Sequence, residues 1–189
     1  MYEVLALIGE KLNCAGVMWA VGGSLLLDQY RLADRMHDID LLVAVEDLKT
    51  VVGLLDRMGC RHQEKSNKGY STRSFYEYTI EEVEVDVMCG LALNHEAGVF
   101  HYPFDKQSVS SIRKIGGIEI PFTSLEDWYV LYQLIPGREE KVRRIETYLS
   151  TNESLNPFFL ERVLEKELPE KIRRRTEAFL SVTAKHSSE

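Results

Sequence analysis

The chain has 189 residues, of which 44% are apolar, enough for one domain with a helical extension or for two small domains. Its net charge of -7 argues against a broad nucleic-acid surface, which needs a basic stripe to meet the phosphate backbone. No apolar run approaches the ~20 residues of a membrane-spanning helix, and the start at Met1–Glu3 lacks a basic secretory segment. Cys14, Cys60 and Cys89 have no metal-ligand spacing, so we expect reduced thiols in a cytoplasmic protein.

Two amphipathic helices are predicted in the first third of the chain. Apolar residues recur at helical spacing from Val4 to Leu12 and again from Leu48 to Met58, where Gly59 follows as a stop signal. Each helix presents one apolar face, so both are expected to cover a sheet.

A glycine turn follows the first predicted strand. The apolar run 17–21 predicts a buried strand, Gly22 and Gly23 end it, and Ser24 is a suitable N-cap for the helix that comes next. The unsatisfied N–H groups at such a helix start favour negative charge, and glycines let the backbone approach oxygen atoms closely. The turn is therefore interpreted as a phosphate-binding site.

Three aspartates are placed on two further strands. Asp38 and Asp40 open the strand 38–43, and residues two apart in a strand share a face. Asp86 lies in the alternating segment 82–88, whose acidic positions share one face. Carboxylates held side by side repel each other, so a proton or a cation must compensate them, and Mg²⁺ suits oxygen ligands.

The rest of the chain divides into strands and then helices. Strands are predicted at 60–65 and 71–80 around a turn at 66–69, and the two glycines of 115–118 predict a tight hairpin. From Ser124 the apolar period becomes helical, with segments at 125–135, 142–149, 159–164 and 172–180. The basic run 171–175 is interpreted as a solvated helix face. We expect an α+β fold with a mixed sheet, helices packed mainly on one side and a helical C-terminal part.

The order strand, Gly-Gly-Ser, helix and Asp-x-Asp strand resembles the nucleotidyltransferase superfamily of polymerase-beta-like fold. That superfamily includes minimal, antibiotic-modifying and abortive-infection toxin-type enzymes. The resemblance implies a catalytic domain over 1–122 and a helical region over 123–189. It implies that the phosphates are bound by Gly22, Gly23 and Ser24. It also implies that two Mg²⁺ ions, or Mn²⁺ in their place, are bound by the catalytic residues Asp38, Asp40 and Asp86.

The implied activity is transfer of an NMP group from an NTP to a hydroxyl. No motif identifies the acceptor, and the acidic chain favours a small molecule or a protein over tRNA. Many relatives carry lysine where this chain has Gln133 and aspartate where it has Val142, so Arg138 or Lys141 would have to substitute. The alternative is a degenerate domain that binds nucleotide or a small helical partner, as in toxin–antitoxin pairs. The three clustered carboxylates favour the interpretation as an enzyme, because a site that no longer binds metal has no physical reason to keep three charges close together.

Overall fold

The computed structural model describes residues 1–62, 69–152 and 154–186, with side chains to Ser181. The chain forms two compact units. Unit 1 comprises Met1–Asn67, Thr72–Leu91 and Pro103–Ser124, and unit 2 comprises Lys68–Ser71, Ala92–Tyr102 and Leu125–Glu189. None of the helices in the described part of the chain is long and apolar enough to cross a membrane.

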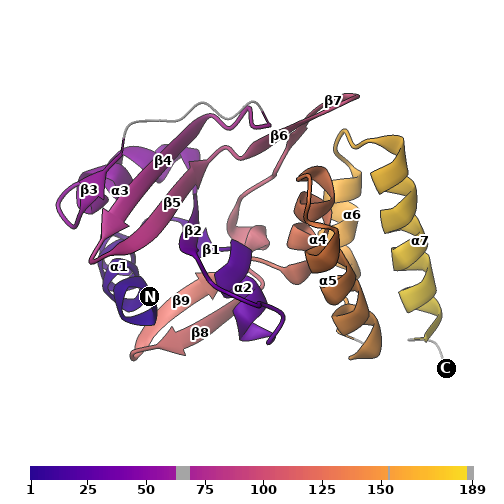
Figure 1. Cartoon of the computed structure of the whole chain (residues 1–189), viewed down its shortest axis with the longest axis horizontal. Helices are drawn as coiled ribbons and strands as arrows, with labels where there is room; N and C mark the ends of the chain where they lie inside the picture. The colour runs from indigo at the N-terminus through magenta and orange to yellow at the C-terminus, as the bar shows by residue number, and fades with distance from the viewer. Residues whose placement is uncertain (63–68, 153, 187–189) are drawn as a thin grey trace. The chain divides into compact units, whose positions relative to one another are not determined.

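A mixed sheet forms the centre of unit 1 (Figure 1). Within the described residues it has seven strands, in the order β3-β4-β5-β2-β1-β9-β8. They are β1 (Trp19–Val21), β2 (Asp38–Val43), β3 (Cys60–Arg61), β4 (Ser74–Ile80), β5 (Val83–Cys89), β8 (Ser111–Ile115) and β9 (Ile118–Phe122). The pairs β2–β5 and β1–β9 are parallel and the others are antiparallel, which confirms the predicted α+β class with a mixed sheet.

The helices of unit 1 are α1 (Tyr2–Ala15), α2 (Gly23–Gln29) and α3 (Leu48–Leu55), with short 3₁₀ turns at Val45–Asp47 and Lys106–Ser108. Helix α1 packs against β8, β9 and α3. Gly9 permits this close approach, because a Cβ at that position would lie 2.3 Å from Ile120 Cδ1. Helix α3 ends at Leu55, before the predicted stop at Gly59.

The predicted hairpin joins β8 to β9. Its loop residues Gly116 and Gly117 have φ values of +57° and +84°, which side chains of L-amino acids rarely adopt. The strand predicted at 60–65 is shorter than expected and ends at Arg61. Most of the turn predicted at 66–69 lies outside the described residues.

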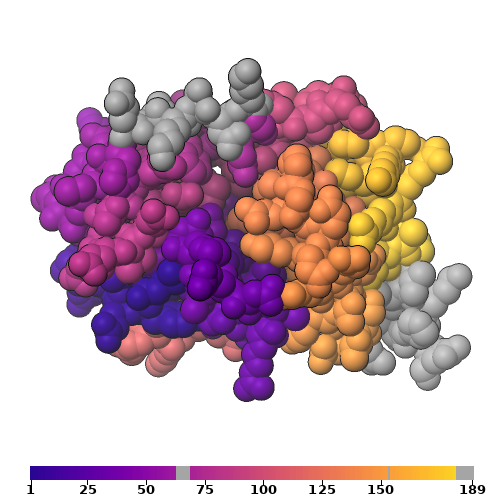
Figure 2. All heavy atoms as spheres, in the orientation of Figure 1, coloured from indigo at the N-terminus to yellow at the C-terminus, as the bar shows by residue number. Residues whose placement is uncertain are grey.

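Among its described residues, unit 2 combines four helices with a two-stranded hairpin. They are α4 (Leu125–Leu134), α5 (Glu139–Thr151), α6 (Pro157–Leu164), α7 (Glu170–His186), β6 (Ala92–His95) and β7 (Gly98–His101). Helix α4 contacts each of the other three helices and β6, so it forms the core of the unit. Figure 2 shows orange atoms of the α5 region at the surface, whereas α4 is buried along almost its whole length. The helices were predicted, whereas the hairpin was not.

Two carboxylates of α4 are buried in unit 2. The Asn156 backbone N–H donates to Glu126 Oε1 at 2.7 Å, and the Tyr102 hydroxyl donates to Asp127 Oδ2 at 2.6 Å. Burial raises the pKa of Glu126 above its ordinary value, although the Asn156 hydrogen bond opposes this effect. These two bonds fix the first turn of α4 to the start of α6 and to the end of the hairpin.

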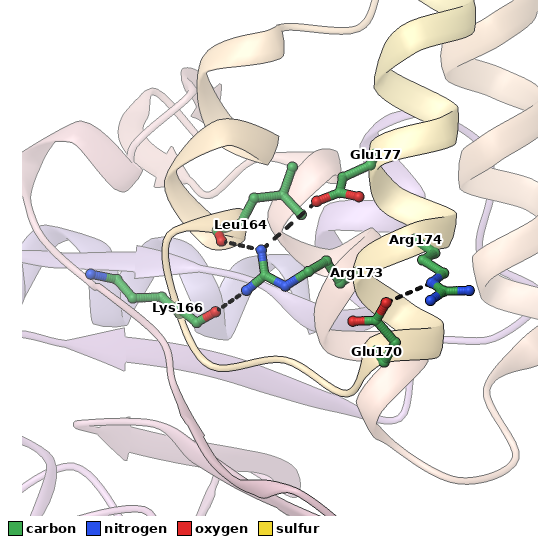
Figure 3. Close-up of polar contacts among 6 residues, drawn as sticks. All are labelled: Leu164, Lys166, Glu170, Arg173, Arg174 and Glu177. Atoms are coloured by element: carbon green, nitrogen blue, oxygen red, sulfur yellow. Dashed lines mark hydrogen bonds and ion pairs between the residues drawn. The ribbon is translucent and has the colours of Figure 1, made fainter.

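The basic run at the start of α7 is only partly a solvated face (Figure 3). Arg173 donates to the backbone oxygens of Leu164 and Lys166, each at 2.7 Å, and so satisfies carbonyls at the end of α6. Arg174 pairs with Glu170 at 2.5 Å within its own helix. The prediction of a solvated face is therefore right for Arg174 and wrong for Arg173, which joins two helices.

We predict that Arg173→Ala lowers the free energy of unfolding by about 1–2 kcal/mol, because charged donors to two helix-end carbonyls are lost. The matched change Arg174→Ala is expected to stay within about 0.5 kcal/mol, because an exposed pair contributes little. The exposed fraction is 31% for the Arg173 side chain and 76% for the Arg174 side chain, which supports this difference. Urea denaturation of both variants measures it, and equal effects would contradict the bridging role of Arg173.

Candidate functional site

The three aspartates meet on one face of the sheet in unit 1. Strands β2 and β5 run parallel with Asp40 beside Asp86, and Asp38 lies two residues before Asp40 on the same face. The residues between them, such as Ile39 and Val85, point to the opposite face and are fully buried. The apolar face therefore fixes the register that brings the carboxylates together.

The size of this cluster suits a divalent cation. Asp38, Asp40 and Asp86 each offer a carboxylate oxygen, and these atoms all lie within 4.8 Å of one another. Opposite oxygens around Mg²⁺ are about 4.2 Å apart, because each Mg–O distance is about 2.1 Å. Three carboxylate oxygens at this spacing could act together as ligands of one divalent cation, and all three side chains are half-buried.

The electrostatics of the cluster also favour a cation. Half-burial removes part of the hydration of three carboxylates that repel one another at short range. A divalent cation relieves both costs, because carboxylate oxygens are the ligands that Mg²⁺ and Mn²⁺ accept. The donor set therefore fits a divalent metal ion.

The glycine turn lies directly against this cluster. The Gly22 N–H donates to the Asp40 backbone oxygen at 3.0 Å, and Gly23 has a φ of +59°. A Cβ at Gly23 would lie 1.6 Å from Asp40 Oδ2, so only glycine fits beside this carboxylate. The structure thus brings the turn predicted to bind phosphate close to the predicted metal ligands.

Ser24 has a different position from the one predicted. Helix α2 begins at Gly23 with Gly22 as its N-cap, so Ser24 is the second residue of the helix and not its cap. Its side chain is buried, and among the described residues its Oγ has no hydrogen-bond partner. A buried hydroxyl without a partner is costly, and an oxygen of a bound ligand would satisfy it.

Thr123 anchors the strand that leads into the glycine turn. Its backbone N–H and its Oγ1 both donate to the Val21 backbone oxygen, at 3.0 and 3.1 Å. Thr123 is fully buried and follows β9, which pairs in parallel with β1. Sequence reasoning missed this role, because no local pattern links Thr123 to a residue a hundred positions earlier.

Further acidic residues share the face of the cluster. Glu77 on β4 lies directly across from Asp86, and Glu84 on β5 lies across from Asp38. Paired residues on neighbouring strands project to the same side of a sheet. The alternation of residues 76–80 indicates that Glu77 and Thr79 share one face of the strand, but the register that places Glu77 beside Asp86 could not be read from the sequence.

The positions that depart from the superfamily pattern belong to unit 2. Gln133 donates to the Tyr129 backbone oxygen at 3.3 Å, and Val142 is buried in the helical core. Lys141 Nζ lies 4.7 Å from the centre of the Tyr132 ring and bonds the Tyr132 hydroxyl. These residues therefore have structural contacts within unit 2.

A mixed sheet with a glycine turn beside an Asp-x-Asp strand defines a nucleotidyltransferase of polymerase-beta-like fold. Residues 4–147 match the family described as aminoglycoside-2''-adenylyltransferase, and the chain belongs to this family. No curated protein is similar enough in sequence to count as a match.

Solved structures share the fold. TM1012 of Thermotoga maritima, described as a nucleotidyltransferase, is 25% identical, with 79% of this chain and 92% of that chain covered and a TM-score of 0.60. ANT(2'')-Ia, solved with adenylyl-2''-tobramycin, is 15% identical over 94% and 97% of the two chains, with a TM-score of 0.56. The lincosamide antibiotic adenylyltransferase LnuA, solved with lincomycin, is 17% identical over 77% and 96%, with a TM-score of 0.52.

We predict that Gly23→Ala lowers the free energy of unfolding by at least about 1–2 kcal/mol, because the residue has positive φ and its new methyl group would meet the Asp40 carboxylate. Gly53→Ala is the control, since Gly53 lies within α3 with no atom within 4 Å of an added Cβ. It is expected to be neutral or to stabilise by about 0.5–1 kcal/mol. Chemical denaturation measures both, and a neutral Gly23→Ala would contradict the close approach.

Proposed function

We propose that the chain is a metal-dependent nucleotidyltransferase that moves an NMP group from an NTP to a hydroxyl of an acceptor. One observation carries the proposal: the carboxylate oxygens of Asp38, Asp40 and Asp86 lie within 4.8 Å of one another, beside the turn at Gly23. Membership in an adenylyltransferase family supports the same reaction class. In this proposal residues 1–122 carry the chemistry, and residues 123–189 form the helical part.

Asp38, Asp40 and Asp86 are the proposed ligands of Mg²⁺, with Mn²⁺ as a substitute. Two such ions, when bound, would neutralise the charge that develops on the phosphate oxygens of an in-line displacement. The three carboxylates come from two adjacent strands whose other faces are buried, so their positions are fixed before substrate binds.

The glycine turn is the proposed site for the triphosphate. Gly22 and Gly23 place backbone at the edge of the carboxylate cluster without side chains, and the unsatisfied Ser24 hydroxyl can donate to a phosphate oxygen. These groups hold the β- and γ-phosphates, which leave together as pyrophosphate when the bond from the α-phosphorus to its bridging oxygen breaks.

Asp86 is the proposed base of the reaction. The acceptor oxygen forms a bond to the α-phosphorus and loses its proton, and an ionised Asp86 beside this position can accept that proton. Asp86 lies across from Glu77, so a second carboxylate borders the place where an acceptor would approach.

The acceptor is proposed to be a small hydroxylated molecule. The family description names aminoglycoside adenylylation, and aminoglycosides carry both hydroxyl and amino groups. Glu77 and Glu84 extend the acidic face around the cluster and would favour an acceptor with positive charge. The same face disfavours tRNA, whose phosphates it would repel.

Calorimetric titration of ATP, GTP, CTP and UTP with Mg²⁺ tests the nucleotide site without knowledge of the acceptor. We expect at least one NTP to bind the wild type in a metal-dependent way, and binding to be lost in Asp38→Asn/Asp40→Asn because two metal ligands lose their charge. Glu10→Gln on α1, an exposed acidic residue away from the cluster, should bind like the wild type. Binding to neither protein would support the degenerate domain, and unchanged binding in the double variant would refute the metal site.

Asp86→Asn separates binding from chemistry. We expect NTP affinity within about threefold of the wild type, because Asp38 and Asp40 remain, and transfer lowered by at least about 100-fold, because the base is lost. Pyrophosphate release with tobramycin as the trial acceptor measures the transfer, with Glu10→Gln again as the control. Equal rates in Asp86→Asn and wild type would overturn the role of Asp86.

A further inference from the structure

A cavity of about 380 Å³ lies wholly within unit 2. Four segments line it: the end of β6, the end of α4, the start of α5 and the start of α7. Its volume falls in the range of roughly 300–1,000 Å³ that small-molecule sites occupy. It shares no residue with the carboxylate cluster or the glycine turn, which belong to unit 1.

His95, at the end of β6, gives this cavity a defined hydrogen-bond donor. The Ala97 backbone N–H donates to His95 Nδ1 at 3.2 Å, so Nδ1 carries no proton and the neutral ring holds its hydrogen on Nε2. His95 Nε2 is buried and has no partner among the described residues. A buried N–H without an acceptor is costly, so this group is suited to an oxygen of a bound molecule.

Apart from its exposed charged groups, the rest of the lining contains apolar residues, the neutral polar residues Asn94, Tyr132 and Gln133, and the cation Arg175. Leu134, Val142 and Ile172 are buried residues that line the cavity. Arg175 also lines it and pairs with Glu146 at 2.6 Å, but Glu146 is not part of the lining. Its guanidinium has five N–H donors, so some remain for a ligand.

The other charged groups of the lining lie at its rim. Glu96, Glu139 and Lys171 are exposed, so water and salt screen them. The less exposed part of the lining therefore combines apolar surface and three neutral polar side chains with donors from His95 and Arg175, and it has no carboxylate. This combination suits a ligand whose head accepts hydrogen bonds and carries negative charge.

We propose that unit 2 binds a small carboxylate with an apolar body in this cavity. The carboxylate accepts hydrogen bonds from His95 Nε2 and from Arg175, and the apolar body lies against Leu134, Val142 and Ile172. This site is separate from the proposed nucleotidyl transfer, and it requires neither NTP nor metal.

Three probes with one ring and different heads test the proposal: phenylacetate, phenylacetamide and phenethylamine. Each is titrated into the full ¹⁵N-labelled chain with EDTA and without nucleotide, and chemical shifts are followed by NMR. We expect phenylacetate to bind at millimolar concentration or below, the amide more weakly, and the amine most weakly. The shifts should centre on residues of the cavity such as Gln133 and Ile172. Absence of phenylacetate binding, or tighter binding of the amine, would overturn the proposal.

His95→Phe keeps a ring of similar size but removes the donor, so phenylacetate should bind about tenfold more weakly. His101→Phe is the matched control, because His101 is an exposed residue of β7 in the same hairpin and outside the lining. Gln133→Trp provides a second test by filling the cavity from α4, and it should abolish binding. Unchanged affinity in His95→Phe, or in a folded Gln133→Trp, would place the probe elsewhere.

Asp38→Asn/Asp40→Asn distinguishes this site from the site in unit 1. Phenylacetate should bind this variant with the affinity of the wild type, whatever the outcome of the nucleotide titrations. A loss of phenylacetate binding in this variant would show that the probe depends on the carboxylate cluster and would overturn the separate site.

Discussion

The parallel pairing of β2 with β5 is the constraint on which the site depends. It sets Asp40 beside Asp86, and it does so because Ile39, Val85 and Val87 must all lie on the buried face. A slip of one residue would turn the aspartates toward the core and the valines toward solvent, at a cost far above that of any single contact. The repulsion among the carboxylates is therefore imposed by apolar burial on the other side of the same strands.

The contact between Gly23 and Asp40 couples this pairing to the glycine turn. The turn needs positive φ at Gly23, and the carboxylate of Asp40 occupies the place of a side chain there. Thr123 holds the preceding strand by two bonds to Val21, so the turn is positioned from both neighbouring strands. The elements that would hold phosphate and metal are thus one connected structure within unit 1.

Unit 2 shows where local pattern and tertiary contact disagree. The helical period from Ser124 onward predicted its helices, because apolar stripes recur every three to four residues. The β6–β7 hairpin was missed, since each strand is four residues long and its polar Asn94 and His95 break the apolar alternation. Arg173 was assigned to solvent by its charge, although it bonds the carbonyls at the end of α6. Such contacts depend on which helix end lies nearby.

The sequence by itself determined the local geometry of the site: a glycine turn after a strand, and Asp38 and Asp40 on one face, because strand periodicity is a property of neighbouring residues. It also determined the hairpin at Gly116 and Gly117, where backbone sterics leave little choice. Only the tertiary structure decided that Asp86 lies beside Asp40, that Ser24 is buried without a partner, and that His95 faces a cavity. These features join segments far apart in the chain, and their register is set by the burial of the whole sheet and helical core, which no local propensity records.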